Sequence, residues 1–236
     1  MQGIDFSYGL LAALAIALLI AAVTDLRRRQ IDNWLNAAIA AAAPLYWWAS
    51  GYGLADIGWQ LGLALATFAV TTLMFVLRGM GGGDVKLLTA LALWIAPLDF
   101  MRMIVMMALI GGMLSVFAAA RNLKPAEHER VRTVVAKVAA SLWVVLSLYA
   151  IFVIGGGTPL PLGTMLDAVA STRSAPWILA ASAAAILITA GLGVSHIVRR
   201  QLKPLPIPYG LAISAAGLWL LASKYLPTAP GTANLG

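Results

Sequence analysis

Long apolar segments without charge are the feature that most constrains how this chain folds. A helix needs about 20 mostly apolar residues to cross the hydrocarbon core of a bilayer, and such segments recur along nearly the whole sequence. Of the 236 residues, 61% are hydrophobic and 11% charged, whereas a soluble domain has roughly 25% charged residues. A soluble fold of this size could not bury so much apolar surface. The sequence therefore predicts an all-α, polytopic transmembrane helix bundle that spans the lipid bilayer.

The pattern gives eight candidate spans. The fourth is short, so we expect it either to extend back through the preceding glycines or to lie inside the bundle. The eight segments are Phe6–Leu26, Asn33–Gly51, Leu54–Leu77, Asp84–Pro97, Met101–Ala120, Val134–Ile154, Pro176–Val198 and Ile207–Leu226.

The positive charges predict the orientation. If the spans alternate from an outside N-terminus, thirteen of the sixteen Lys and Arg residues lie on the cytoplasmic side, and only Arg102, Arg173 and Lys224 lie outside. Cytoplasmic loops carry such an excess, so we expect both termini outside. The formal charge of +7 is thereby explained by topology, and we expect no nucleic acid partner. Because Arg27–Arg29 follow the first apolar run, that run is not expected to be a cleavable signal peptide.

Two of the nine acids stand out. Asp25 ends the first span, and Asp84 follows Gly79-Met-Gly-Gly-Gly at the start of the fourth. The predicted topology puts both at the cytoplasmic boundary, where a carboxylate near hydrocarbon suggests a functional site. If they lie within a few ångströms, they share one proton, so one can activate a water while the other hydrogen-bonds a carbonyl. Such a pair performs aspartyl peptidase chemistry. The alternative is structural: Asp25 pairs with Arg27–Arg29, and Asp84 caps a helix.

Helix ends suggest which acid holds that proton. The C-terminal end of the first span disfavours an ionised Asp25. Asp84 can accept a hydrogen bond from the backbone of Lys86 or Leu87, and the Lys86 ammonium would favour its charge. We therefore expect the proton on Asp25.

Other chemistries have little support in the sequence. There are no cysteines and only two histidines, His128 and His196, in different loops, so we expect no metal and no cofactor. The glycine run lacks the Lys-Ser/Thr ending of a phosphate-binding loop. A non-enzymatic alternative remains: a small ion-coupled membrane transporter.

Three segments resemble the type IV prepilin peptidases, which are GxGD aspartyl peptidases. Gly81-Gly82-Gly83-Asp84 resembles the G-x-G-D motif, and the segment from Asp25 to Asn33 resembles the first aspartate box, in which Asp32 stands where the family often has proline. Pro208-Tyr209-Gly210 resembles the start of the last helix in the short branch that serves Flp-type, tight-adherence pili.

The resemblance implies a multi-pass endopeptidase of the bacterial inner membrane. It would remove the short basic leader of prepilins or pseudopilins at the cytoplasmic face, cutting after a glycine before the apolar helix. Asp25 and Asp84 would be the catalytic pair, with Gly81 and Gly83 shaping the loop beside the substrate. The Cys-x-x-Cys domain of the methylating long branch is not in this sequence, so N-methylation is not expected. A non-catalytic subunit of pilus assembly is the second non-enzymatic alternative.

The resemblance also divides the single membrane domain, residues 1–236. Residues 6–121 and 203–226 form the peptidase-like core. Residues 122–202 add a cytoplasmic loop and two further spans that the family pattern does not explain.

Overall fold

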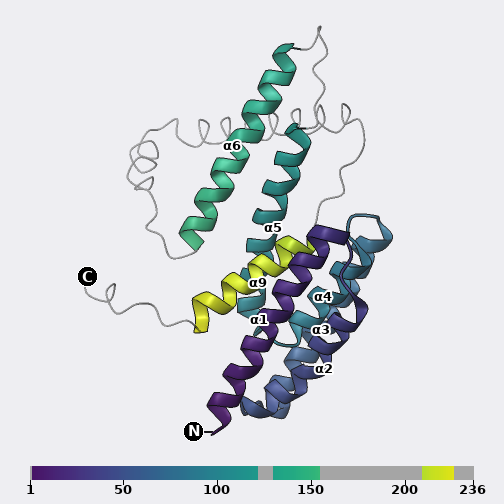
Figure 1. Cartoon of the computed structure of the whole chain (residues 1–236), viewed down its shortest axis with the longest axis vertical. Coiled ribbons are helices and arrows are strands. Elements are labelled where there is room, and N and C mark those ends of the chain that lie inside the picture. Colours follow the sequence, from purple (N-terminus) through teal and green to yellow (C-terminus); the bar gives the residue numbers. More distant parts are fainter. Residues whose placement is uncertain (1, 122–129, 155–208, 226–236) are drawn as a thin grey trace, which may run out of the picture. The chain divides into compact units, whose positions relative to one another are not determined.

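All the regular secondary structure in the described part of the chain is helical. The computed structural model describes residues 2–121, 130–154 and 209–225 (Figure 1). These ranges contain no strand, which confirms the predicted all-α class. Their seven helices are α1 (Gln2–Arg28), α2 (Asn33–Ala49), α3 (Leu54–Val76), α4 (Gly82–Ala92), α5 (Pro97–Arg121), α6 (Arg130–Ile154) and α9 (Tyr209–Tyr225).

The chain forms two compact units. The first comprises Met1–Gly111 and Pro208–Gly236, so it contains α1 to α4, the first part of α5, and α9. The second comprises Gly112–Ile207, with the rest of α5 and α6. The candidate residues all belong to the first unit. Within it, α1 packs against α2 and α9, while α4 packs against α2, α3 and α9.

Four helices are long and apolar enough to cross a membrane. They cover Phe6–Arg28, Leu54–Val76, Pro97–Ala119 and Thr133–Ile154, so the chain is a multi-pass membrane protein. The helices α2 and α9 have 17 residues each, at the lower limit for a span. The predicted span Pro176–Val198 lies outside the described residues, so eight spans and two outside termini stay predictions.

The short helix α4 lies inside the first unit. Seven of its eleven residues are buried, and α2, α3 and α9 all contact it. A helix of eleven residues is about 16 Å long, which is too short to cross the hydrocarbon core. The helix begins at Gly82, within the glycines, but this extension does not make it long enough to span. The structure therefore supports the expectation that the segment lies inside the bundle.

The end of α4 is held by side chains of its neighbours. The last carbonyls of a helix have no partner within it, and inside a membrane protein other groups must satisfy them. Gln60 of α3 donates from Nε2 to the carbonyls of Ala92 (3.4 Å) and Ile95 (3.1 Å). Trp47 of α2 donates from Nε1 to the carbonyl of Leu93 (2.7 Å). These bonds explain how the helix can stop within an apolar bundle.

We expect Gln60→Leu to destabilise the protein. The substitution introduces an apolar side chain of similar size and leaves two buried carbonyls without their donor, which costs about 1–3 kcal/mol. Denaturant unfolding of the purified protein in micelles measures the loss. Trp59→Phe is the matched control, because the neighbouring Trp59 is 73% exposed. A free energy of unfolding equal to that of the wild type would mean that these carbonyls do not depend on Gln60.

Candidate active site

Asp25 lies in the last turn of α1 and is only 5% exposed. The helix closes just after it, where Arg29 adopts a left-handed conformation (φ 54°) and donates its N–H to the Asp25 carbonyl (2.8 Å). The side chain turns towards α9. Its Oδ2 accepts the backbone N–H of Leu211 at 3.0 Å, and the Gly210 amide also acts on this carboxylate. Asp25 is therefore a buried carboxylate held by the first turn of another helix.

Asp84 is the third residue of α4 and is 8% exposed. Its Oδ2 accepts the backbone N–H of Gly81, the residue that caps the helix, at 3.3 Å. Asp56 makes the same local contact at the start of α3, where it accepts the N–H of Gly53 at 3.0 Å. Unlike Asp84, Asp56 is exposed. Asp84 therefore does cap its helix, but burial distinguishes it from an ordinary capping residue.

The first unit brings both carboxylates into one region. They are close enough for their charges to interact. Ile31, between α1 and α2, lies close both to Gly83 beside Asp84 and to Gly210 beside Asp25. A Cβ built on Gly83 would lie 3.3 Å from the Cβ of Ile31, and a Cβ built on Gly210 would lie 2.7 Å from the Cδ1 of Ile31. The three segments of the prepilin-peptidase resemblance thus contact one another around this one side chain.

The start of α2 is bonded to the start of α4. Asn36, 4% exposed, donates from Nδ2 to the carbonyl of Gly83 at 3.4 Å, while its Oδ1 is buried without a partner. Lys86 donates to Oδ1 of Asn33 at 2.7 Å. The sequence analysis missed Asn36. An amide among the apolar residues of α2, one turn after Asn33, was the available signal, but its partner could not be known before the helices were packed.

The middle and outer glycines of the motif differ in their surroundings. A Cβ on Gly81 would lie 3.0 Å from the Asp84 carboxylate, and one on Gly83 would meet the Cβ and backbone nitrogen of Ile31 at 3.3 and 3.5 Å. A Cβ on Gly82 would only touch the Phe75 ring at 3.5 Å, which is ordinary contact. Gly81 and Gly83 therefore have no space for a side chain, Gly81 beside the Asp84 carboxylate and Gly83 beside Ile31.

The expectation about the shared proton loses its physical basis. The donor to Asp84 is Gly81, not Lys86 or Leu87, and the Lys86 ammonium is bonded to Asn33. Asp25 ends α1 as expected, but its carboxylate faces the N-terminus of α9, where the helix dipole is positive. Both acids thus accept a backbone N–H at a helix start, and helix ends do not distinguish them.

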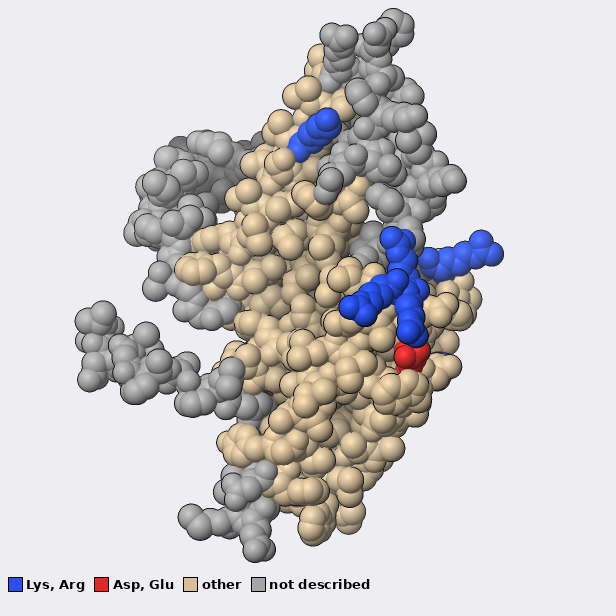
Figure 2. Space-filling model, in the orientation of Figure 1, with Lys and Arg blue, Asp and Glu red and all other residues tan. Residues whose placement is uncertain are grey.

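The arginines near Asp25 do not neutralise it through contact. None of the ion pairs in the described ranges includes Asp25, although the charge of Arg29 acts on it. Figure 2 shows blue side chains gathered over the end of α1, where Arg27–Arg29 lie. The structural alternative for Asp25, a direct pair with these arginines, is therefore not what the described residues form.

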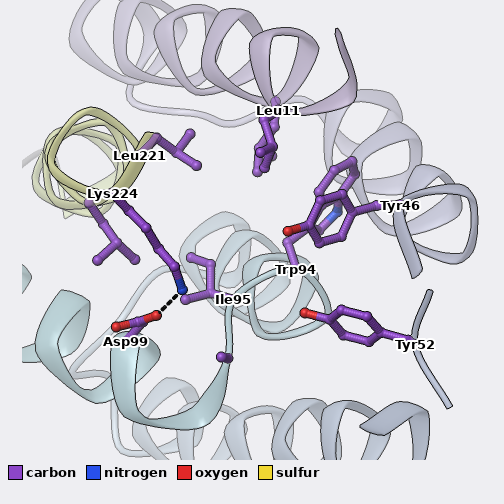
Figure 3. Close-up of a pocket in the computed structure, with 11 residues that line it drawn as sticks. Leu11, Tyr46, Tyr52, Trp94, Ile95, Asp99, Leu221 and Lys224 are labelled. Atoms are coloured by element: carbon purple, nitrogen blue, oxygen red, sulfur yellow. Dashed lines mark hydrogen bonds and ion pairs between the residues drawn. The ribbon is translucent and has the colours of Figure 1, made fainter. Parts of the chain in front are cut away.

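A small pocket lies between residues of α1, the C-terminal ends of α2 and α9, and the turn after α4 (Figure 3). Leu11, Tyr46, Trp94 and Lys224 are among the residues that line it. Its acid, Asp99, pairs with Lys224 and with Arg102 (3.5 Å). Asp25, Asp84 and Gly210 do not line this pocket, so it is separate from the paired carboxylates.

The paired acids can perform acid–base chemistry. Where two buried carboxylates lie adjacent, they resist ionising together and can hold one proton between them. The ionised member can take a proton from water while the protonated member donates a hydrogen bond to a carbonyl oxygen. The described residues contain no cluster of three or more His, Cys, Asp or Glu side chains that could hold a metal ion.

The comparisons with known proteins support a peptidase domain. No curated protein and no solved structure matches the chain. Residues 12–116 match the family model described as the type IV leader peptidase family, and this segment contains both Asp25 and Asp84. Residues 12–116 are therefore similar to the type IV leader peptidase family.

Proposed function

We propose that this protein is a membrane-embedded aspartyl endopeptidase that removes the leader peptide of Flp-like type IV prepilins or pseudopilins. The family match supports cleavage of a prepilin leader. The observation that supports the catalytic assignment is that Asp25 and Asp84 are carboxylates from different helices whose charges interact, each less than 9% exposed and each accepting a backbone N–H. We expect Gly81 and Gly83 to shape the loop beside the substrate, since neither position has space for a side chain.

Leader removal would proceed through general acid–base catalysis. The ionised aspartate takes a proton from a water molecule, whose oxygen attacks the scissile carbonyl carbon, while the protonated aspartate hydrogen-bonds the carbonyl oxygen. Collapse of the tetrahedral intermediate breaks the C–N bond, and the leaving nitrogen takes a proton from the pair. The products are a free leader and a mature pilin with a new N-terminus.

Co-expression with a candidate substrate tests the proposal. A Flp-type prepilin with a short basic leader is expressed in bacteria with and without this protein, and the pilin is analysed by gel shift and by mass spectrometry of its N-terminus. We expect a shorter pilin, cut after the leader glycine, only in the presence of the protein. An uncut pilin beside normally inserted protein would contradict the assignment, and type IV prepilins of other branches then serve as the next substrates.

The proposed site faces the cytoplasm of a bacterial inner membrane. Arg27–Arg29 follow Asp25 directly, and basic residues are retained on the cytoplasmic side. We expect tags at both termini to be accessible from outside the membrane and a tag inserted near residue 126 to be protected. Accessibility to a membrane-impermeant label measures this. An exposed N-terminus with a protected C-terminus would imply an odd number of spans and contradict the predicted topology.

A further inference from the structure

We propose that the first turn of α9 positions the Asp25 carboxylate, and that Gly210 is the residue that lets the carboxylate reach it. This inference rests on the proposed function, because positioning matters only if Asp25 reacts. The contact joins parts of the chain 186 residues apart. Asp84, in contrast, is held by its own helix start through Gly81, three residues away. The two members of the pair are thus positioned in different ways.

The first turn of α9 is suited to hold a carboxylate. Its backbone N–H groups have no partner within the helix, and they carry the positive end of the helix dipole. The Leu211 N–H donates to Oδ2 of Asp25 at 3.0 Å, and the Gly210 amide acts on the same group. Hydrogen bonds to a charged acceptor are the stronger kind. This turn therefore fixes where the Asp25 oxygens lie relative to Asp84.

Gly210 is required for space rather than for an unusual backbone. Among the described glycines only Gly51 has a positive φ. A Cβ at position 210 would lie 2.8 Å from Oδ2 and 2.9 Å from Cγ of Asp25, and 2.7 Å from Cδ1 of Ile31. These distances are shorter than van der Waals contact, so any side chain would move the carboxylate away from the amides. Gly210 is a positioning residue that acts through Asp25.

The same face of α9 supplies a matched control. Gly217 lies two turns further on and packs against α1 at Leu18, seven residues before Asp25. A Cβ there would lie 2.9 Å from Cδ1 of Leu18. Gly217→Ala therefore introduces a comparable clash between the same two helices without touching a carboxylate.

Kinetics of leader cleavage separate positioning from packing. With a Flp-type prepilin as substrate and the full-length protein in liposomes, we expect Gly210→Ala to lower kcat at least about tenfold while KM stays within about twofold, because a small displacement of a reacting group is costly. Gly217→Ala should keep kcat near the wild-type value even if it melts earlier. An equal fall in kcat for both variants would overturn the proposal, since Gly210 would then serve helix packing alone.

Ile31→Val tests which clash matters. It removes the Cδ1 atom that a Cβ at position 210 would meet, while leaving the Asp25 contact unchanged. We expect Ile31→Val with Gly210→Ala to stay as slow as Gly210→Ala alone. Recovery of kcat in the double variant would assign the loss to Ile31 and contradict the role of the carboxylate.

Melting temperatures decide the proposal without any substrate. In the Ile31→Val background, Gly210→Ala should lower the melting temperature in nanodiscs when Asp25 is present, and lower it less when Asp25→Ala has removed the carboxylate. An equal fall in both backgrounds would overturn the positioning role. If the wild type cleaves no prepilin, the proposed function fails, while this comparison still shows whether α9 holds Asp25.

Discussion

Asp25→Asn and Asp84→Asn are each expected to abolish leader cleavage, while the protein still inserts normally. Asparagine has nearly the same shape but cannot hold the shared proton or take one from water. General acid–base catalysis contributes about 10²–10⁴-fold, so the loss should be at least of that size. Because the pair acts as a unit, the double variant should be no worse than either single variant. Cleavage is measured with the co-expressed prepilin.

Asp56→Asn is the control for this experiment. Asp56 accepts the N–H of Gly53 as Asp84 accepts the N–H of Gly81, and the amide oxygen of asparagine can accept the same bond. If Asp84 were only a capping residue, both substitutions would leave cleavage intact. We expect Asp56→Asn to cleave normally and Asp84→Asn not at all. Cleavage by Asp84→Asn or Asp25→Asn at normal expression would rule out the catalytic pair.

The three glycines before Asp84 should differ in how well they tolerate alanine. Gly83→Ala places a methyl group 3.3 Å from Cβ of Ile31, an atom that cannot rotate away, and Gly81→Ala places one 3.0 Å from the Asp84 carboxylate. Each should lower kcat/KM about 10- to 100-fold, because misplacement by a fraction of an ångström to 1 Å is costly. Gly82→Ala meets only the Phe75 ring at 3.5 Å and should stay within about twofold of the wild type.

This comparison separates space from backbone freedom. All three substitutions reduce the conformational freedom of the same segment, since alanine is more restricted than glycine. If the motif needs glycine mainly for flexibility, Gly82→Ala should be as damaging as its neighbours. Equal losses in the three variants would therefore contradict the role given to Gly81 and Gly83, and cleavage assays at matched protein levels provide the measurement.

Patterns local in the chain were enough to predict the helical class, the membrane and the two acids. Apolar runs of about 20 residues imply spans whatever the tertiary arrangement, because the bilayer requires them. Asp25 and Asp84 could be selected because each adjoins a long uncharged run, where a carboxylate is costly without a function. The resemblance to the leader peptidases rested on short motifs, and a family match over residues 12–116 supports it.

The tertiary structure decided how those residues are held. Nothing near Asp25 in the sequence indicates that its partner is Leu211, and the argument from the end of α1 did not include the α9 amides that this carboxylate faces. Likewise, the end of α4 depends on Gln60 and Trp47. Their side chains donate hydrogen bonds to carbonyls that have no partner within the helix. The reason is physical: burial and hydropathy follow from nearby residues, whereas a hydrogen bond across 186 residues exists only once the helices have packed.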